Sequence, residues 1–159
     1  MIERTRILFL CTANSARSIV AEAIANQMFG DHIIAHSAGS HPRSEPNPLA
    51  LALLREHSLD TSKCSSKSWD VFRSEEFDVV VTLCDQAAAE TCPVFPGAPA
   101  VVHWGLPDPP ASDDPQQMFA HIFDALVVAF EAFIDAPPYD APARVTIAQR
   151  ALETYLREI

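Results

Sequence analysis

Basic residues are scarce in this chain. Lysine and arginine together number 11, against 21 aspartates and glutamates, and the formal net charge is -10. Nucleic acid backbones and anionic membrane surfaces both repel a protein with this charge, so the composition argues against either partner. Any anion that the chain binds must be held by local geometry that overcomes the overall field.

Long apolar runs are also missing from the sequence. No stretch approaches the roughly 20 consecutive apolar residues that a membrane span requires, and there is no repeat or low-complexity tract. The first residues, MIERTRILFLC, mix charges of both signs with a four-residue apolar run, which is unlike a secretory signal. We therefore expect a cytoplasmic protein with no membrane association.

The sequence lacks the ligand pairs of a typical metal site. Zinc sites require cysteines or histidines at close spacing, and neither the four cysteines nor the six histidines form such pairs. In a reducing compartment the cysteines should not form a structural disulfide framework either. They are then either buried and inert or catalytic, and their positions matter: Cys11, Cys64, Cys84 and Cys92.

Short apolar runs alternate with helical patterns along the chain. Buried strands are predicted at 7–10, 32–37, 77–84 and 100–104. Helices are predicted from about 17 to 29, from 48 to 57 after the cap Asn47, and from 115 to 135 after the cap Asp114. A shorter amphipathic helix should follow the breaker APPYDAP. The pattern predicts one α/β domain: a four-stranded parallel sheet with helices on both faces and a C-terminal helical extension.

Three chemically capable residues follow strands of this predicted sheet. Cys11 comes directly after the first strand, Cys84 after the third, and Asp108 a few residues after the fourth. In parallel α/β sheets, ligands bind outside the carboxyl ends of the strands. We therefore expect these three side chains to converge on one rim.

The stretch CTANSARS, residues 11–18, joins the first strand to the first helix. A loop this short that opens a helix turns successive backbone N–H groups inward and forms a site for a tetrahedral oxyanion. Arg17 adds a planar bidentate clamp, and the N–H groups, the helix dipole and the guanidinium all favour the reactive thiolate of Cys11. Asn14 and Ser18 can orient the loop and the thiolate by hydrogen bonds. We call residues 11–17 the anion loop, and we expect all of them to bind the anion: Cys11, Thr12, Ala13, Asn14, Ser15, Ala16 and Arg17.

With this loop, the sequence resembles the low-molecular-weight protein tyrosine phosphatase superfamily. The signature of that superfamily is a cysteine, five residues, an arginine, and then a serine or threonine. Within it, the chain is most similar to the arsenate reductases. The resemblance runs from the first strand to the helix that ends near residue 135, and it implies an enzyme domain at 1–136. Residues 137–159 are then an extension packed on the same domain.

The resemblance also implies roles for individual residues. Cys11 is the nucleophile, Asn14 organises the loop, Arg17 clamps the oxyanion and Ser18 stabilises the thiolate. The general acid is an aspartate in an Asp-Pro loop, which matches Asp108 in PDPP. Many family members have glycine where this chain has an alanine at position 13, and alanine fits only if the backbone avoids a glycine-only conformation.

The reaction implied by the resemblance is the reduction of arsenate through a cysteine relay. Cys11 attacks arsenate, Cys84 attacks the Cys11 sulfur and releases arsenite, and Cys92 attacks Cys84 and frees Cys11. Thioredoxin, or glutaredoxin with glutathione, then reduces the Cys84–Cys92 disulfide. Cys64 has no role in this scheme.

The spacing of Cys84 and Cys92 raises a geometric problem. A disulfide requires Cα atoms within about 7 Å. Eight helical steps would separate the two by roughly 12 Å. If the segment between them is helical in the reduced state, it must unwind or loop back to form the bond.

Two other functions stay open on the sequence alone. One is a low-molecular-weight phosphatase that hydrolyses phosphotyrosine or small phosphoesters through a cysteinyl-phosphate. The segment DPPASDDPQQ has no aromatic residue to sandwich a phenyl ring, and the loop interior is small and polar, which both count against an aryl substrate. The other is an oxyanion-binding or redox-regulated adaptor, against which the intact Cys-Arg-Ser signature and Asp108 argue.

Some arsenate reductases of this family bind a potassium ion beside the anion loop. Asn14, Glu22 and Ser37 match three of its ligands, but Ser65 and Lys67 stand where a threonine and an aspartate are expected. The ammonium of Lys67 should repel a cation and supply the positive charge itself. We therefore expect no potassium site, no metal and no tightly bound cofactor.

Overall fold

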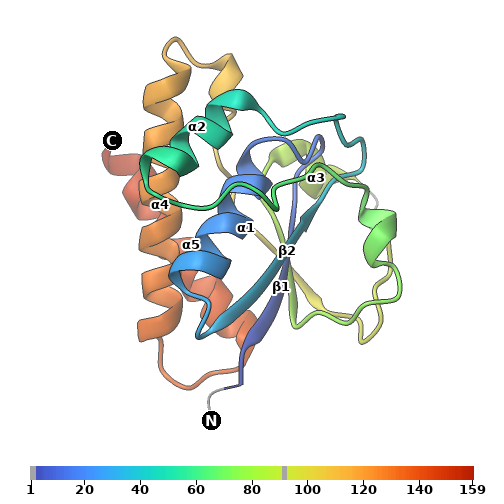
Figure 1. The fold of residues 1–159 in the computed structure, drawn as a ribbon. Helices are drawn as coiled ribbons and strands as arrows, with labels where there is room; N and C mark the ends of the chain where they lie inside the picture. Colours follow the sequence, from blue (N-terminus) through green and yellow to red (C-terminus); the bar gives the residue numbers. More distant parts are fainter. Residues whose placement is uncertain (1–2, 91–92) are drawn as a thin grey trace.

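The structure is a computed structural model that describes residues 3–90 and 93–159. Strands and helices alternate along the chain (Figure 1). The elements are β1 (Thr5–Leu10), α1 (Arg17–Met28), β2 (Ile33–Ala38), α2 (Pro48–Glu56), the 3-10 helix η1 (Trp69–Phe72), β3 (Val79–Thr82), α3 (Asp85–Ala89), β4 (Ala100–His103), the 3-10 helix η2 (Pro109–Ala111), α4 (Pro115–Asp135) and α5 (Ala141–Glu158).

The strands form one parallel sheet in the order β2-β1-β3-β4. Their register aligns the carboxyl ends, because Leu10 of β1 pairs with both Ala38 of β2 and Thr82 of β3. The connection after β1 leads to β2 on one side of the sheet, and the connection after β3 leads to β4 on the other side. The loops after β1 and β3 therefore diverge and leave a crevice at the carboxyl ends of these two strands. The predicted four-stranded parallel sheet is confirmed.

The two faces of the sheet are covered differently. Alternate residues of the central strands point to opposite faces. One set joins the core formed with α1, α2, α4 and α5: Ile7, Phe9, Val79 and Val81. The other set packs on η1 and the loops around it: Leu8, Leu10 and Val80 against Phe72, Phe77 and Phe95. In the described part of the chain, the four long helices therefore lie on one face, and η1 and connecting segments pack on the other (Figure 1). Of the helices expected on both faces, the second face has the short 3-10 helix η1.

The helices begin in two different ways. Asn47 caps α2 by accepting a hydrogen bond from the N–H of Leu49 (2.8 Å), and Asp114 caps α4 through the N–H of Gln117 (3.1 Å), as the sequence predicts. In contrast, α1 follows Ala16, has no side-chain cap and carries no acidic residue in its first turn. The first N–H groups of α1 are therefore open to another partner.

The sequence analysis expects no segment apolar enough to span a membrane, and helix α4 does not meet this expectation. By length and composition α4 passes that test, with a mean hydropathy of 1.5, and it is the one helix to do so in the described part of the chain. Its buried residues lie in the core of the protein: Phe119, Ile122, Phe123, Ala125, Leu126, Ala129, Phe130 and Phe133. The apolar composition of α4 serves packing inside the fold.

Helix α5 is longer than the sequence pattern predicts. It starts directly after Asp140, whose side chain accepts a hydrogen bond from the N–H of Ala143 (2.9 Å). The prolines and aspartate of the breaker thus provide a helix start, because proline fits the first turn of a helix. Leu152 is fully buried, and the carbonyl of Val145 accepts a hydrogen bond from the indole N–H of Trp104 (3.1 Å).

Candidate active site

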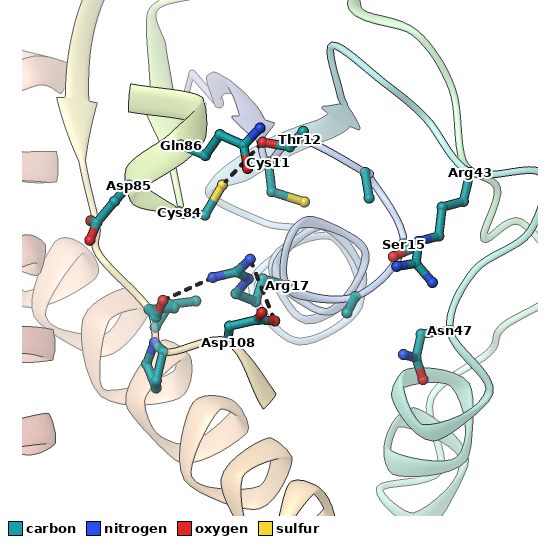
Figure 2. Close-up of a pocket in the computed structure, with 14 residues that line it drawn as sticks. Cys11, Thr12, Ser15, Arg17, Arg43, Asn47, Cys84, Asp85, Gln86 and Asp108 are labelled. Atoms are coloured by element: carbon teal, nitrogen blue, oxygen red, sulfur yellow. Dashed lines mark hydrogen bonds and ion pairs between the residues drawn. The ribbon is translucent and has the colours of Figure 1, made fainter. Parts of the chain in front are cut away.

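A cavity of about 570 Å³ opens at the carboxyl ends of the central strands (Figure 2). Its walls come from the anion loop, from Arg43 and Asn47 after β2, from residues 84–86 at the start of α3, and from residues 106–108 after β4. Each of these segments follows the carboxyl end of a strand. The cavity brings together Cys11, Arg17, Cys84 and Asp108, which lie far apart in the sequence.

Backbone hydrogen bonds from the segment after β2 hold the anion loop in place. Three of its carbonyl oxygens accept hydrogen bonds from backbone N–H groups of residues 41–47. The pairs are His41 to Thr12 (2.9 Å), Arg43 to Ala13 (3.0 Å) and Asn47 to Ser15 (2.7 Å). Because these carbonyls point away from the cavity, the loop is turned so that its N–H groups can face an anion inside.

Gly39 allows this close approach of two backbones. A Cβ atom at this position would lie 2.6 Å from the carbonyl oxygen of Cys11 and closer still to that of Thr12. No side chain fits there without moving the anion loop. The glycine that the sequence shows at the end of the second strand therefore has a steric role at the site.

Asn14 organises the interior of the anion loop. It is fully buried and has φ 43°, in the left-handed region that asparagine tolerates better than most residues. Its side-chain amide donates to Ser18 Oγ (2.7 Å), and its Oδ1 accepts from the backbone N–H of Lys67 (2.8 Å). Ala13 is not in the left-handed region, so alanine is compatible with its backbone.

Cys11 sits at the floor of the cavity. Its Sγ lies 2.9 Å from Ser18 Oγ, and the residue is 4% exposed. Because Ser18 Oγ already accepts a hydrogen bond from Asn14, its own hydrogen is available to point at the sulfur. A donated hydrogen bond of this kind stabilises a thiolate. The chain of contacts from Asn14 through Ser18 thus orients the Cys11 thiol.

Arg17 and Asp108 lie together beside the anion loop (Figure 2). Arg17 Nη1 donates to the carbonyl oxygen of Leu106 (3.1 Å), and Nη2 lies 3.8 Å from Asp108 Oδ1. The Arg17 side chain is largely buried, whereas that of Asp108 is 55% exposed. The loop after β4 therefore sets the direction of the guanidinium and places a carboxyl group within reach of it.

Cys84 faces the same cavity from the start of α3. Its Sγ accepts a hydrogen bond from the N–H of Ala87 (3.3 Å) and lies 3.7 Å from Thr12 Oγ1. With Cys11 and Ala87, Cys84 forms a small buried cluster. The pairing of β1 with β3 explains why Cys11 and Cys84 are close together. Leu10 and Thr82 are paired at the ends of these strands, so the residues that follow them start from neighbouring positions.

The remaining two cysteines are Cys64 and Cys92. Cys92 lies outside the described residues. Cys64 lines a separate cavity near Glu22, and burial, with a smaller contribution from the charge of Glu22, raises the pKa of its thiol. A thiol with a raised pKa is less reactive at neutral pH.

Four polar residues of the cavity wall were missed by sequence reasoning: Arg43, Asn47, Asp85 and Gln86. The sequence signal that could have identified them is their position just after the second and third strands, at the edge of the sheet where ligands bind.

Within the described residues, no group of three or more His, Cys, Asp or Glu side chains is placed to hold a metal ion.

This fold and this site define a class of proteins. A parallel α/β sheet carries a Cys–five residues–Arg–Ser loop at the carboxyl end of its first strand, and the loop holds a cysteine thiol beside an uncapped helix start. The chain matches the low molecular weight phosphotyrosine protein phosphatase family over residues 6–137, and it belongs to this family.

Several relatives in this family are arsenate reductases. Arsenate reductase 2 of Staphylococcus epidermidis is 33% identical over 132 residues, which cover 83% of this chain and 98% of that protein. An arsenate reductase of Halalkalibacterium halodurans is 40% identical over 103 residues, covering 65% of this chain and 73% of that protein. A thioredoxin-dependent arsenate reductase of Corynebacterium glutamicum has a similar structure, with a TM-score of 0.63 at 29% identity over 80% of this chain and 61% of that one.

Proposed function

We propose that this chain reduces arsenate to arsenite with its own cysteines and passes the resulting disulfide to an external thiol donor. The observation that carries the proposal is the position of Cys84, whose thiol lines the same cavity as Cys11 and packs in the same buried cluster. A phosphatase of this kind needs one cysteine and a water molecule. A second thiol at this place serves a redox reaction.

In the first step, arsenate occupies the anion loop. The inward N–H groups and the guanidinium of Arg17 hold its oxygens, and Ser18 keeps the Cys11 thiolate aimed at the arsenic. A sulfur–arsenic bond forms as one oxygen leaves as water, and Asp108 donates the proton that this departure needs. The position of Asp108 beside Arg17 supports its role as the general acid.

In the second step, the Cys84 thiolate attacks the Cys11 sulfur. The sulfur–sulfur bond forms as the sulfur–arsenic bond breaks, and the bonding electron pair leaves with arsenic, which departs as arsenite. The two thiols supply the two electrons. Because both sulfurs belong to one buried cluster, the exchange needs no large movement of the sheet.

The third step transfers the disulfide outward to Cys92, which lies outside the described residues. Helix α3 ends at Ala89, and Glu90 already has an extended backbone. The described helix that follows Cys84 has five residues, and helices this short have little stability of their own. We propose thioredoxin, or glutaredoxin with glutathione, as the donor, in a reducing cytoplasm.

No bound metal, potassium ion or cofactor enters this scheme. Burial raises the pKa of Glu22, and the positive charge of Lys67 acts in the opposite direction. We propose that Lys67 supplies the charge that a cation supplies in some relatives.

We also propose that residues 1–136 form the enzyme domain, with 137–159 as an extension packed on it.

The second candidate function is hydrolysis of phosphotyrosine or a small phosphoester through a cysteinyl-phosphate. The family to which the chain belongs favours it, because phosphate and arsenate have the same shape and charge. The described lining of the cavity contains no aromatic ring to stack on a phenyl group, which weighs against an aryl ester.

The proposal is tested by measuring arsenite formation with thioredoxin, thioredoxin reductase and NADPH. We expect activity in the wild type and in Cys64→Ser, and none in Cys84→Ser. Hydrolysis of p-nitrophenyl phosphate, measured in parallel, should be no faster in the wild type than in Cys84→Ser. Arsenite formation by Cys84→Ser at the wild-type rate would refute the relay, and hydrolysis without any arsenite from the wild type would establish the phosphatase.

A further inference from the structure

The cavity extends beyond the reacting sulfurs to a second arginine. Arg43 and Asn47 form the wall on the side of the anion loop opposite Cys84 (Figure 2). The side chain of Arg43 extends back towards Ser15, in the wall of the loop. None of the chemistry above uses this side chain.

The backbone of Arg43 is fixed to the anion loop. Its N–H donates to the carbonyl oxygen of Ala13 (3.0 Å), so its Cα stays next to the loop whatever the side chain does. The guanidinium itself is exposed and has no carboxylate partner or hydrogen bond among the described residues. The two carboxylates of the cavity wall, Asp85 and Asp108, lie on the other side of the loop (Figure 2).

This placement matters because the protein as a whole repels anions. The net charge is -10, and the chain has only 11 basic residues, yet two of its arginines line one cavity. A charge at the mouth of a cleft raises the local concentration of the oppositely charged ligand and speeds its entry, and salt screens the effect. Arg17 is tied to Leu106 and Asp108, which leaves Arg43 to attract the anion first.

We propose that Arg43 captures the incoming oxyanion and sets the affinity of the cavity for doubly charged tetrahedral anions. The identity of the anion as arsenate rests on the proposed function. The capture itself does not, because inorganic phosphate has the same shape and charge. Arg43 takes no part in bond making, so it governs binding and leaves the chemical step unchanged.

The variant Arg43→Gln tests this role, with Arg43→Lys and Arg150→Gln as controls. Any residue except proline keeps the backbone hydrogen bond to Ala13, so the loop should stay folded in all of them. Arg150 lies on α5, which contributes no residue to the cavity, and its replacement makes the same change in net charge. Phosphate affinity is measured by the protection of Cys11 from iodoacetamide, followed by mass spectrometry of the Cys11 peptide.

For Arg43→Gln we expect phosphate affinity to fall by about threefold to tenfold at low salt, with less difference at about 0.5 M salt. Arg43→Lys and Arg150→Gln should stay within about twofold of the wild type, since an exposed charge acts mainly through its sign and position. In turnover, the KM for arsenate should rise in Arg43→Gln while kcat holds.

Equal phosphate affinity in Arg43→Gln and Arg150→Gln would overturn the proposal, as would a loss in kcat with unchanged affinity. These outcomes are separate from the fate of the proposed function. If the wild type forms no arsenite but Arg43→Gln still binds phosphate weakly, the capture role stands and the reductase assignment falls.

Discussion

At the scale of single residues, Asn14 connects several parts of the site. Its left-handed backbone shapes the anion loop, and its side chain connects the backbone of Lys67 to Ser18, which contacts Cys11. Because Asn14 is fully buried, each hydrogen bond that it loses leaves a polar group without water.

The replacements Asn14→Ala and Asn14→Gly separate these two contributions. We expect Asn14→Ala to lower the free energy of unfolding by roughly 2–4 kcal/mol, from the left-handed backbone and the unpaired N–H of Lys67. Asn14→Gly should be about 1 kcal/mol less damaging, because glycine accepts the backbone without strain. Urea unfolding measures both, and equal losses would show that the backbone carries no strain.

The charge of Lys67 offers a second test at this scale. Without Lys67 the pKa of Glu22, already raised by burial, rises further. The stability linked to a raised carboxyl pKa is full below the unfolded value of 4.5 and is lost as the pH rises through the folded pKa. Lys67→Met should therefore cost roughly 0.5–1 kcal/mol at neutral pH and almost nothing at low pH.

A matched background identifies the partner of Lys67. In Glu22→Gln protein, Lys67→Met should produce no pH-dependent loss of stability, because the titrating carboxyl is gone. A loss of the same size at every pH in both backgrounds would assign Lys67 a packing role instead of a charge role.

At the scale of elements, the site depends on the contact between the anion loop and the turn after β2. Gly39→Ala would place a methyl group against the backbone of Cys11 and Thr12. We expect at least a tenfold loss of phosphate affinity and a loss of stability of about 2 kcal/mol or more. Ser40→Ala is the control, because the Ser40 hydroxyl is hydrogen-bonded to the exposed His41 and Ser40 is not among the described lining residues of the cavity. Gly39→Ala protein with normal phosphate affinity would contradict this steric role.

The elements also show what the sequence can and cannot reveal. The strands, the caps Asn47 and Asp114 and the anion loop are determined by local patterns, so they were predictable. The position of Arg43 after the second strand places it at the correct edge of the sheet, but its backbone hydrogen bond to Ala13 has no local sequence pattern that would predict it. The early start of α5 was missed because a proline-rich stretch can break a helix or begin one, and packing against α4 decides which.

At the scale of the whole molecule, α5 completes the core behind the sheet. Leu152 is fully buried there, whereas Ile159 at the chain end is 53% exposed. We expect Leu152→Ala to cost about 2–4 kcal/mol of stability and Ile159→Ala less than about 0.5 kcal/mol. Thermal unfolding followed by circular dichroism measures both. A negligible effect of Leu152→Ala would mean that the C-terminal extension is dispensable for the fold.

The fold brings two sulfurs to one cavity. Strands β1 and β3 are neighbours in the sheet, and their loops deliver Cys11 and Cys84 to the same cavity although they lie 73 positions apart in the sequence. The redox proposal depends on this convergence, whereas the proposed oxyanion binding uses the anion loop and Arg43 and does not need Cys84.

The most direct measurement is disulfide mapping after a single turnover. Cys92→Ser protein is mixed with arsenate without any external reductant, then alkylated, digested and analysed by mass spectrometry. We predict a disulfide between Cys11 and Cys84 together with one arsenite per protein, and Cys64 free. Recovery of Cys84 as a free thiol, with or without an adduct on Cys11, would contradict the account.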